Sequence, residues 1–161
     1  MDGPRVPPFE GMFVLRRSLF ALMLAFAVAA CGGSDNNNPN NPTPTPQGPA
    51  NLVIEDVTIG TGAEATGGRQ LTVTYFLYHY DPAGNAGRGQ LIQGPQSFQF
   101  RQGTNGVIPG FELGTASMLV GGIRRLTIPP SLAYGANGNP NAGIAGNEWI
   151  VFDVQLTAVA D

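Results

Sequence analysis

A single cysteine, Cys31, and a single histidine, His79, are the side chains of this sequence best suited to nucleophilic or metal-binding chemistry. One cysteine excludes an internal disulfide and a zinc site built from cysteine pairs. One histidine excludes a histidine cluster and leaves a Ser-His-Asp arrangement with one candidate base. His79 lies late in a predicted strand, where we expect a half-exposed side chain without a catalytic role. The sequence therefore predicts no metal site and argues against most hydrolase mechanisms.

The charged residues argue against a second group of functions. The 161-residue chain has a net charge of −3, and all eight of its basic residues are arginines. Because no polybasic stretch is present, we predict no nucleic-acid partner. Arg124 and Arg125 are expected at a solvated strand end, with an inward-facing arginine paired to Glu112 as the alternative.

Cys31 stands at the end of a segment typical of protein export. Arg16 and Arg17 precede an apolar stretch over residues 19–30, which is too short to span a membrane and ends in small residues. This pattern resembles a bacterial lipoprotein signal, whose cysteine is lipidated and becomes the mature N-terminus. We therefore predict a signal peptide over residues 1–30 and a lipid anchor on Cys31. The alternative is an ordinary secretory signal with a chance cysteine.

The composition changes twice after this cysteine. Residues 31–50 are rich in Asn, Pro and Thr and contain no large apolar side chain, so they predict a tether. Residues 51–161 are long enough for one compact domain with one core. With 23 Gly and 14 Pro, the chain favours turns and short strands over long helices.

Hydrophobic patterning within residues 51–161 predicts an antiparallel sheet and one short helix. The expected strands cover residues 52–59, 71–80, 97–101, 123–128 and 148–159. The second of these has bulky groups on both faces, which indicates a central strand covered on both sides. The glycine-rich residues 81–95 are expected to form a loop, and residues 109–119 have the only helical spacing, with Phe111, Thr115 and Met118 on one face. The fold class is therefore α+β, with an antiparallel β-sheet around one short α-helix.

Several long motifs identify a family. Residues 103–135 read GTNGVIPGFELGTASMLVGGIRRLTIPPSLAYG, and residues 151–159 read VFDVQLTAV. These closely resemble the FKBP-type peptidyl-prolyl isomerases, and the likeness runs over nearly all of residues 52–159. The resemblance implies the FKBP-like fold and prolyl isomerisation. Because this reaction breaks no bond, it requires no nucleophile, metal or cofactor, and an aromatic pocket that desolvates the twisted imide is sufficient.

The resemblance also implies the residues of the site. Aromatic side chains form the pocket, and neighbouring residues hold the peptide, with a carbonyl bound by the backbone N–H of Ile108 and another by the hydroxyl of Tyr134. The implied catalytic residues are Tyr75, Phe98, Phe111, Tyr134 and Phe152, and the implied substrate-binding residues are Val107, Ile108, Leu91 and Ile144. Asp153 alternates with Phe152 and is expected to point away from the pocket.

One segment departs from the family pattern. Where the family carries Phe-Asp-Ser-Ser, residues 89–94 read GQLIQG, so Leu91 is expected at the position of the aromatic. The family carboxylate is absent unless Asp81 reaches the site. We therefore predict an isomerase of reduced activity, with a catalytically weak proline-peptide-binding or chaperone module as the alternative.

The two resemblances together predict where the protein acts. A lipid anchor on Cys31 implies a periplasm-facing protein of the bacterial cell envelope, with the outer membrane favoured because Gly32 follows the cysteine. The expected substrates are proline-containing segments of envelope proteins, and the family implies macrolide ligands. We expect a monomer.

Overall fold

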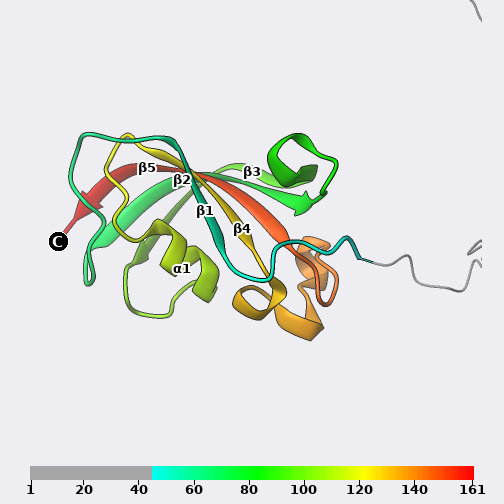
Figure 1. Ribbon diagram of the computed structural model, residues 1–161. Helices are drawn as coiled ribbons and strands as arrows, with labels where there is room; N and C mark the ends of the chain where they lie inside the picture. The colour runs from blue at the N-terminus through cyan, green and yellow to red at the C-terminus, as the bar shows by residue number, and fades with distance from the viewer. Residues whose placement is uncertain (1–44) are drawn as a thin grey trace, which may run out of the picture. The chain divides into compact units, whose positions relative to one another are not determined.

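A computed structural model describes residues 45–161, and the predicted signal peptide, Cys31 and most of the tether lie outside these residues. The described part is an antiparallel five-stranded sheet in the order β1-β4-β5-β2-β3, with helix α1 on one side of its curved surface (Figure 1). The strands are β1 (Val53–Thr58), β2 (Gln70–Tyr80), β3 (Arg88–Arg101), β4 (Ile123–Ile128) and β5 (Ile150–Ala160), and the helix is α1 (Pro109–Thr115). The predicted α+β fold is confirmed.

Strand β5 is the central strand of the sheet. It pairs with β4 on one side and with β2 on the other. Its apolar residues Ile150, Phe152, Val154 and Leu156 are all buried on the face that α1 covers, as their spacing predicts. The expectation that residues 71–80 form a strand covered on both sides is wrong, because alternate positions of β2 are only half-buried.

The opposite face of β5 carries charge. Asp153 accepts hydrogen bonds from Arg125 of β4 at 2.7 Å and from Arg88 of β3 at 2.9 Å. The hydrogen bond to Asp153 raises the pKa of Arg125 above its ordinary value. Asp153 therefore points away from the face that carries Phe152, as predicted. Its hydrogen bonds connect β5 to β4 and to β3.

Strand β3 corrects the loop expected over residues 81–95. The turn is limited to the residues before β3, including the 3-10 helix η1 (Asn85–Gly87), and pairing with β2 begins at Arg88. The register shifts three times between Tyr75 and Tyr80, so β3 is a bulged strand. The sequence pattern did not indicate this strand, because glycine has a low strand propensity. The strand forms nevertheless, because long-range pairing with β2 outweighs that propensity.

Helix α1 begins with Pro109 at its first turn and ends at Thr115, four residues earlier than predicted. Gly110 and Gly114 allow it to approach β4 closely, since a Cβ at Gly114 would lie 2.5 Å from the side chain of Leu126. Arg124 donates hydrogen bonds to the carbonyls of Gly114 and Ala116, at 2.9 and 2.8 Å, which caps the helix end.

These contacts overturn the expectation of a solvated strand end for Arg124 and Arg125. Both side chains are only 12% exposed. Arg124 pairs with Asp56 of β1 rather than with Glu112. The arginines are therefore structural parts of the sheet and of the helix end.

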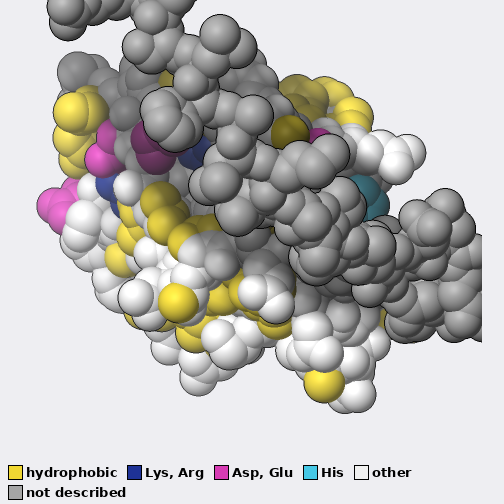
Figure 2. Space-filling model, turned by 45° about the vertical axis from the view of Figure 1, so that its right-hand side comes forward, with side chains coloured by type: hydrophobic (Ala, Val, Ile, Leu, Met, Phe, Trp, Pro, Cys, Tyr) yellow, Lys and Arg dark blue, Asp and Glu magenta, His cyan; other side chains and the backbone are white. Residues whose placement is uncertain are grey.

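Strand β1 forms one edge of the sheet and is exposed along its whole length. Val53, Ile54, Val57 and Ile59 have exposed apolar side chains in and just after this strand. On the face drawn in Figure 2, apolar side chains likewise lie beside acidic and basic groups.

The segment between β4 and β5 forms a flap that consists of three short 3-10 helices, η2 (Pro130–Leu132), η3 (Gly135–Asn137) and η4 (Pro140–Ala142). Its far end contacts the residues just before β1, where the indole N–H of Trp149 donates to the carbonyl of Pro49 at 2.9 Å. Gly48 lies against the same indole ring. No helix within residues 45–161 is long and apolar enough to cross a membrane.

Candidate active site

A cavity of about 450 Å³ opens between the sheet, helix α1 and the flap. Its walls come from five separate segments of the chain. The lining residues are Tyr75 of β2, Phe98 of β3, Phe152 of β5, Phe111 of α1, Tyr134 of the flap, and Asn105, Gly106, Val107 and Ile108 of the loop before α1. None of these side chains is charged. The structure thus brings together all five predicted catalytic residues and two of the four predicted substrate-binding residues.

Aromatic rings pack edge to face at the bottom of this cavity. The ring centroid of Phe111 lies 5.0 Å from the centroid of Phe152 and 6.1 Å from the centroid of Tyr75, with interplanar angles of 69° and 74°. Phe100, beneath them, lies 5.6 Å from Phe111. Phe111 and Phe152 are almost fully buried, whereas Phe98 is 40% exposed at the rim. Such edge-to-face contacts stabilise the rings and hold the cavity open in one shape.

Few polar groups face the cavity, and two of them are free to bind a ligand. Within residues 45–161, the hydroxyl of Tyr134 forms no hydrogen bond, and the backbone N–H of Ile108 donates to no protein group. Tyr75 is engaged, since its hydroxyl donates to Oε1 of Gln93 at 3.2 Å. Burial, and then the neighbouring hydroxyl of Tyr134, raises the pKa of Tyr75 above its ordinary value. The phenol of Tyr75 therefore stays protonated at physiological pH.

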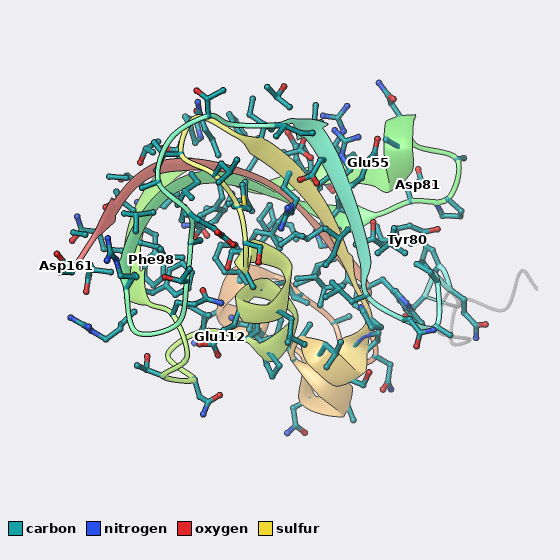
Figure 3. The ribbon with its side chains drawn as sticks, turned by 60° about the vertical axis from the view of Figure 1, so that its left-hand side comes forward. Glu55, Tyr80, Asp81, Phe98, Glu112 and Asp161 are labelled. Atoms are coloured by element: carbon teal, nitrogen blue, oxygen red, sulfur yellow. The ribbon has the colours of Figure 1, made fainter. Side chains whose placement is uncertain are left out.

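Buried polar contacts fix the loop that carries Val107 and Ile108. Glu112 of α1 is 9% exposed, and its Oε1 accepts a hydrogen bond from the N–H of Gly103 at 2.5 Å. Gln102 donates to the carbonyl of Glu112 at 2.8 Å. Figure 3 shows Glu112 on the helix on the same side of the sheet as Phe98. The start of the loop is therefore held by α1, the helix into which its other end leads directly.

Ile144 and Leu91 are not on the cavity wall. Ile144 is 2% exposed and belongs to the hydrophobic core, where it supports the flap from inside. Leu91 is 49% exposed, while its neighbour Ile92 packs against the core. Ile92 rather than Leu91 is therefore the inward-facing residue of this segment, because bulges in the β2–β3 pairing change which side chains face inward, but it does not line the aromatic cavity.

Asp81 does not reach the site. Its carboxylate accepts the N–H of Ala83 at 2.9 Å within the turn before β3. Asp81 and Phe98 lie at opposite ends of the domain in Figure 3. Gln93 is instead the residue that accepts the hydrogen bond of Tyr75, so this hydroxyl contacts a neutral amide and not a carboxylate.

Asn105, Gly106 and Gln93 are site residues that sequence reasoning missed. Asn105 has a positive φ of 55°, which Asn tolerates better than most residues, and the Asn-Gly pair is a turn signal that could have marked this wall. No signal in the sequence pointed to Gln93, since its contact with Tyr75 depends on the bulged pairing of β2 and β3.

His79 has a structural partner. Its Nδ1 contacts Oε1 of Glu148, whose other oxygen accepts the N–H of Ala145 at 2.6 Å. His79 is 30% exposed, close to the half-exposed state expected, and it joins β2 to the end of the flap.

Comparisons with known proteins identify the family of this chain. The sequence profile of the family described as "FKBP-type peptidyl-prolyl cis-trans isomerase" matches residues 61–157. The chain is 39% identical over 114 residues to "FK506-binding protein 4" of Dictyostelium discoideum, covering 70% of this chain and 29% of that protein. It is 40% identical over 106 residues to the "39 kDa FK506-binding nuclear protein" of Drosophila melanogaster, covering 66% and 29%. The chain thus matches less than a third of the length of these relatives.

Solved structures show the same fold. The crystal structure of FkpA from Escherichia coli is similar with a TM-score of 0.57 and 34% identity, over 68% of this chain and 48% of that one. AtFKBP13 gives a TM-score of 0.57 and 28% identity, over 68% of this chain and 93% of that one. Together with the matched profile, these similarities show that the chain belongs to the FKBP-type peptidyl-prolyl cis-trans isomerase family.

Proposed function

We propose that residues 51–161 catalyse cis–trans isomerisation of prolyl peptide bonds in proteins of the bacterial cell envelope. The observation that carries this proposal is the uncharged aromatic cavity, with the free hydroxyl of Tyr134 and the free N–H of Ile108 at its edge. A proline ring fits the chemistry of such a cavity, because it is apolar and lacks a backbone N–H that would need a partner.

The residues of the cavity suggest how the barrier is lowered. Rotation about an X–Pro bond costs about 18 to 20 kcal/mol because it breaks amide resonance. An imide carbonyl removed from water by Phe111 and Phe152 loses the hydration that favours the planar, polar form, so the twisted form becomes more favourable. The Ile108 N–H and the Tyr134 hydroxyl then hold the flanking carbonyls while the bond turns.

A protease-coupled assay with a short prolyl peptide tests this proposal. We expect the chain from residue 32 onward to accelerate isomerisation, and Tyr134→Phe to lower kcat/KM by about two- to tenfold, since a neutral hydrogen bond contributes about 0.5 to 1.5 kcal/mol. Tyr78→Phe is the matched control, because Tyr78 does not line the cavity and stacks on Phe76. Equal rates with and without the protein would contradict the proposal.

The alternative function is a catalytically weak module that binds proline peptides or unfolded chains in the same cavity. The observation that favours it is that the Tyr75 hydroxyl donates to the neutral amide of Gln93 and that no carboxylate lines the cavity. Measurable binding of a prolyl peptide without acceleration of its isomerisation would select this alternative.

We further propose that the domain is attached to the membrane through lipid on Cys31 and a tether over residues 31–50, facing the periplasm. The support is the sequence pattern before the cysteine. The outer membrane is the favoured location, and a monomer that binds macrolide ligands of the family is the expected form.

A further inference from the structure

Strand β1 is an open edge of the sheet. It pairs only with β4, and within residues 45–161 no loop backbone group bonds to its other side. Its outward N–H and C=O groups are therefore available to a further strand. Every residue of β1 is exposed, including the apolar side chains of Val53 at 43% and Ile54 at 46%. Apolar side chains beside unpaired backbone groups suit a strand to which another chain is added.

Each face of β1 carries a small cavity beside this edge. On the face opposite α1, a cavity of about 240 Å³ is lined by Val53 and Glu55, together with Arg125 of β4. On the face that α1 covers, a cavity of about 110 Å³ is lined by Asp56, together with Arg124 of β4. Successive side chains of an added strand point alternately to these two faces. Both faces therefore offer space for a side chain of such a strand.

A carboxylate of β1 lines each cavity, and neither carboxylate is fully used. Glu55 is 59% exposed, and its Oε2 lies 3.7 Å from Nη1 of Arg125, beyond hydrogen-bond distance. Figure 3 shows Glu55 on the side of the sheet away from Glu112 and α1. Asp56 is 44% exposed, and only its Oδ1 is bonded to a described residue, accepting from Nε of Arg124 at 2.6 Å. Both acids therefore retain oxygens that can bind a cationic group.

Charge argues against a second copy of this chain as the added strand. Antiparallel pairing of two β1 strands about their centres would place Glu55 of one copy opposite Asp56 of the other, and like charges directly opposite are destabilising. Basic side chains at these positions would pair with both acids instead. The net charge of −3 also favours a basic partner.

We propose that β1 binds an extended segment of another protein as an added antiparallel strand, in which two adjacent basic residues precede two apolar residues. The basic residues lie opposite Asp56 and Glu55, one on each face, and the apolar residues lie opposite Ile54 and Val53. No residue of β1 lines the aromatic cavity. This surface is therefore separate from the proposed prolyl site and does not depend on it.

Proline-free peptides test this surface without filling the aromatic cavity. One capped peptide contains Thr-Lys-Arg-Val-Val-Thr, and the other has two Glu in place of Lys and Arg. Their dissociation constants with the full chain are measured by fluorescence anisotropy. We expect the basic peptide to bind at least fivefold more tightly than the acidic one, because each opposite-charge cross-strand pair contributes about 1.4- to fivefold in affinity and like charges oppose binding.

A lysine on the edge should block the basic peptide. Because Ile54 is exposed, Ile54→Lys should leave the domain folded, and we expect it to weaken binding of the basic peptide at least fivefold by charge repulsion. Leu91→Lys is the matched control: it makes the same kind of change at a 49% exposed residue of β3, the other edge strand of the sheet. We expect this control to leave the affinity unchanged.

The acids are tested by neutral variants. Glu55→Gln with Asp56→Asn should reduce the ratio of the two affinities to one or less, since the arginines of β4 are then free to attract the acidic peptide. Glu64→Gln with Asp81→Asn removes two charges outside β1 and should leave the ratio unchanged.

Amide hydrogen exchange shows where the peptide lies. A saturating amount of the basic peptide should slow exchange of the outward amides of residues 53–56 at least fivefold and leave exchange in β3 unchanged. Equal affinities for the two peptides, or binding that leaves exchange in β1 unchanged, would overturn the proposal. A dimer that Ile54→Lys dissociates would also overturn it, because a second copy would then occupy β1. Expected binding by a chain that isomerises no prolyl peptide would support this surface and contradict the proposed function.

Discussion

Gln93 gives the site its unusual electrostatic character. A carboxylate at this position would accept the Tyr75 hydroxyl more strongly than an amide does, because hydrogen bonds to charged groups contribute about 1.5 to 3 kcal/mol and those between neutral groups about 0.5 to 1.5. The charge would also act in a low-dielectric cavity, where one ion affects the distribution of charge in the imide strongly. The neutral amide of Gln93 therefore gives the site a weaker electrostatic field than a carboxylate would.

We predict that the paired change Ile92→Phe with Gln93→Asp raises kcat/KM for a short prolyl peptide by about two- to tenfold, the difference between a neutral and a charged hydrogen bond. The control is Leu91→Phe, which adds an aromatic ring at a position that the structure leaves exposed. A gain from Leu91→Phe, with none from the paired change, would show that Leu91 rather than Ile92 faces the substrate.

Tyr75 makes the free energy of unfolding of the domain depend on pH in the alkaline range. Because burial raises the pKa of Tyr75, the folded state holds the phenolic proton more tightly than the unfolded chain does. This contribution to stability is complete below about pH 10, the ordinary tyrosine value, and is lost as the pH rises through the folded value. We predict that Tyr75→Phe makes the alkaline decline in the free energy of unfolding less steep, measured by urea unfolding from pH 8 to 11. Identical declines would contradict this assignment.

At the scale of elements, the close packing of α1 on β4 depends on glycine. Gly114→Ala would improve helix propensity by about 1 kcal/mol, but its Cβ would lie 2.5 Å from Leu126 side-chain atoms. Overpacking of this kind costs about 1 to 3 kcal/mol. We therefore predict a net loss of stability, seen as a lower midpoint in urea unfolding.

The exposed neighbour in the same helix provides the control for this prediction. Leu113 is 57% exposed, so Leu113→Ala should change the free energy of unfolding by no more than about 0.5 kcal/mol. If Gly114→Ala proved stabilising, α1 would have room to move away from β4, and the position of Phe111 would be less constrained than the packing indicates.

The elements differ in how far sequence could predict them. Strand β4 has the predicted bounds, because Ile123 to Ile128 is a short apolar run between a Gly-Gly turn and a Pro-Pro pair. The residues around the aromatic cavity were expected only because the chain resembles the FKBP family, and local patterning alone would have assigned Tyr75 and Phe152 to core packing. Local patterns were sufficient for strand bounds that local chemistry sets.

Strand β3 shows why the rest could not be predicted. Its first half is rich in glycine and polar residues, and it is a strand only because β2 pairs with it over a long distance in sequence. Each bulge in that pairing shifts the register, and a shift of one residue moves a side chain to the other face. This is why the sequence pattern predicts that Leu91 faces inward, whereas Ile92 does so in the structure. It is also why the pattern does not reveal the contact between Gln93 and Tyr75.

At the scale of the whole molecule, the proposed lipid anchor on Cys31 can be tested by substitution. We predict that Cys31→Ser moves the protein from the membrane fraction to the soluble periplasmic fraction, because stable anchoring requires more than one acyl chain. Fractionation followed by immunoblotting measures this, with Ser34→Ala as a control that leaves the cysteine in place. Membrane association that survives Cys31→Ser would contradict the lipid anchor.

The contact between Pro49 and Trp149 has a spectroscopic consequence. Trp149 is the single tryptophan of the chain, and it lies at the junction with the tether rather than on the wall of the aromatic cavity. Its fluorescence should therefore change little when a peptide fills that cavity. Release of residues 48 and 49 from the indole would expose the ring to water and shift its emission to longer wavelength. The protein thus contains an optical reporter of whether residues 48 and 49 stay packed on the domain, independent of whether its site is occupied.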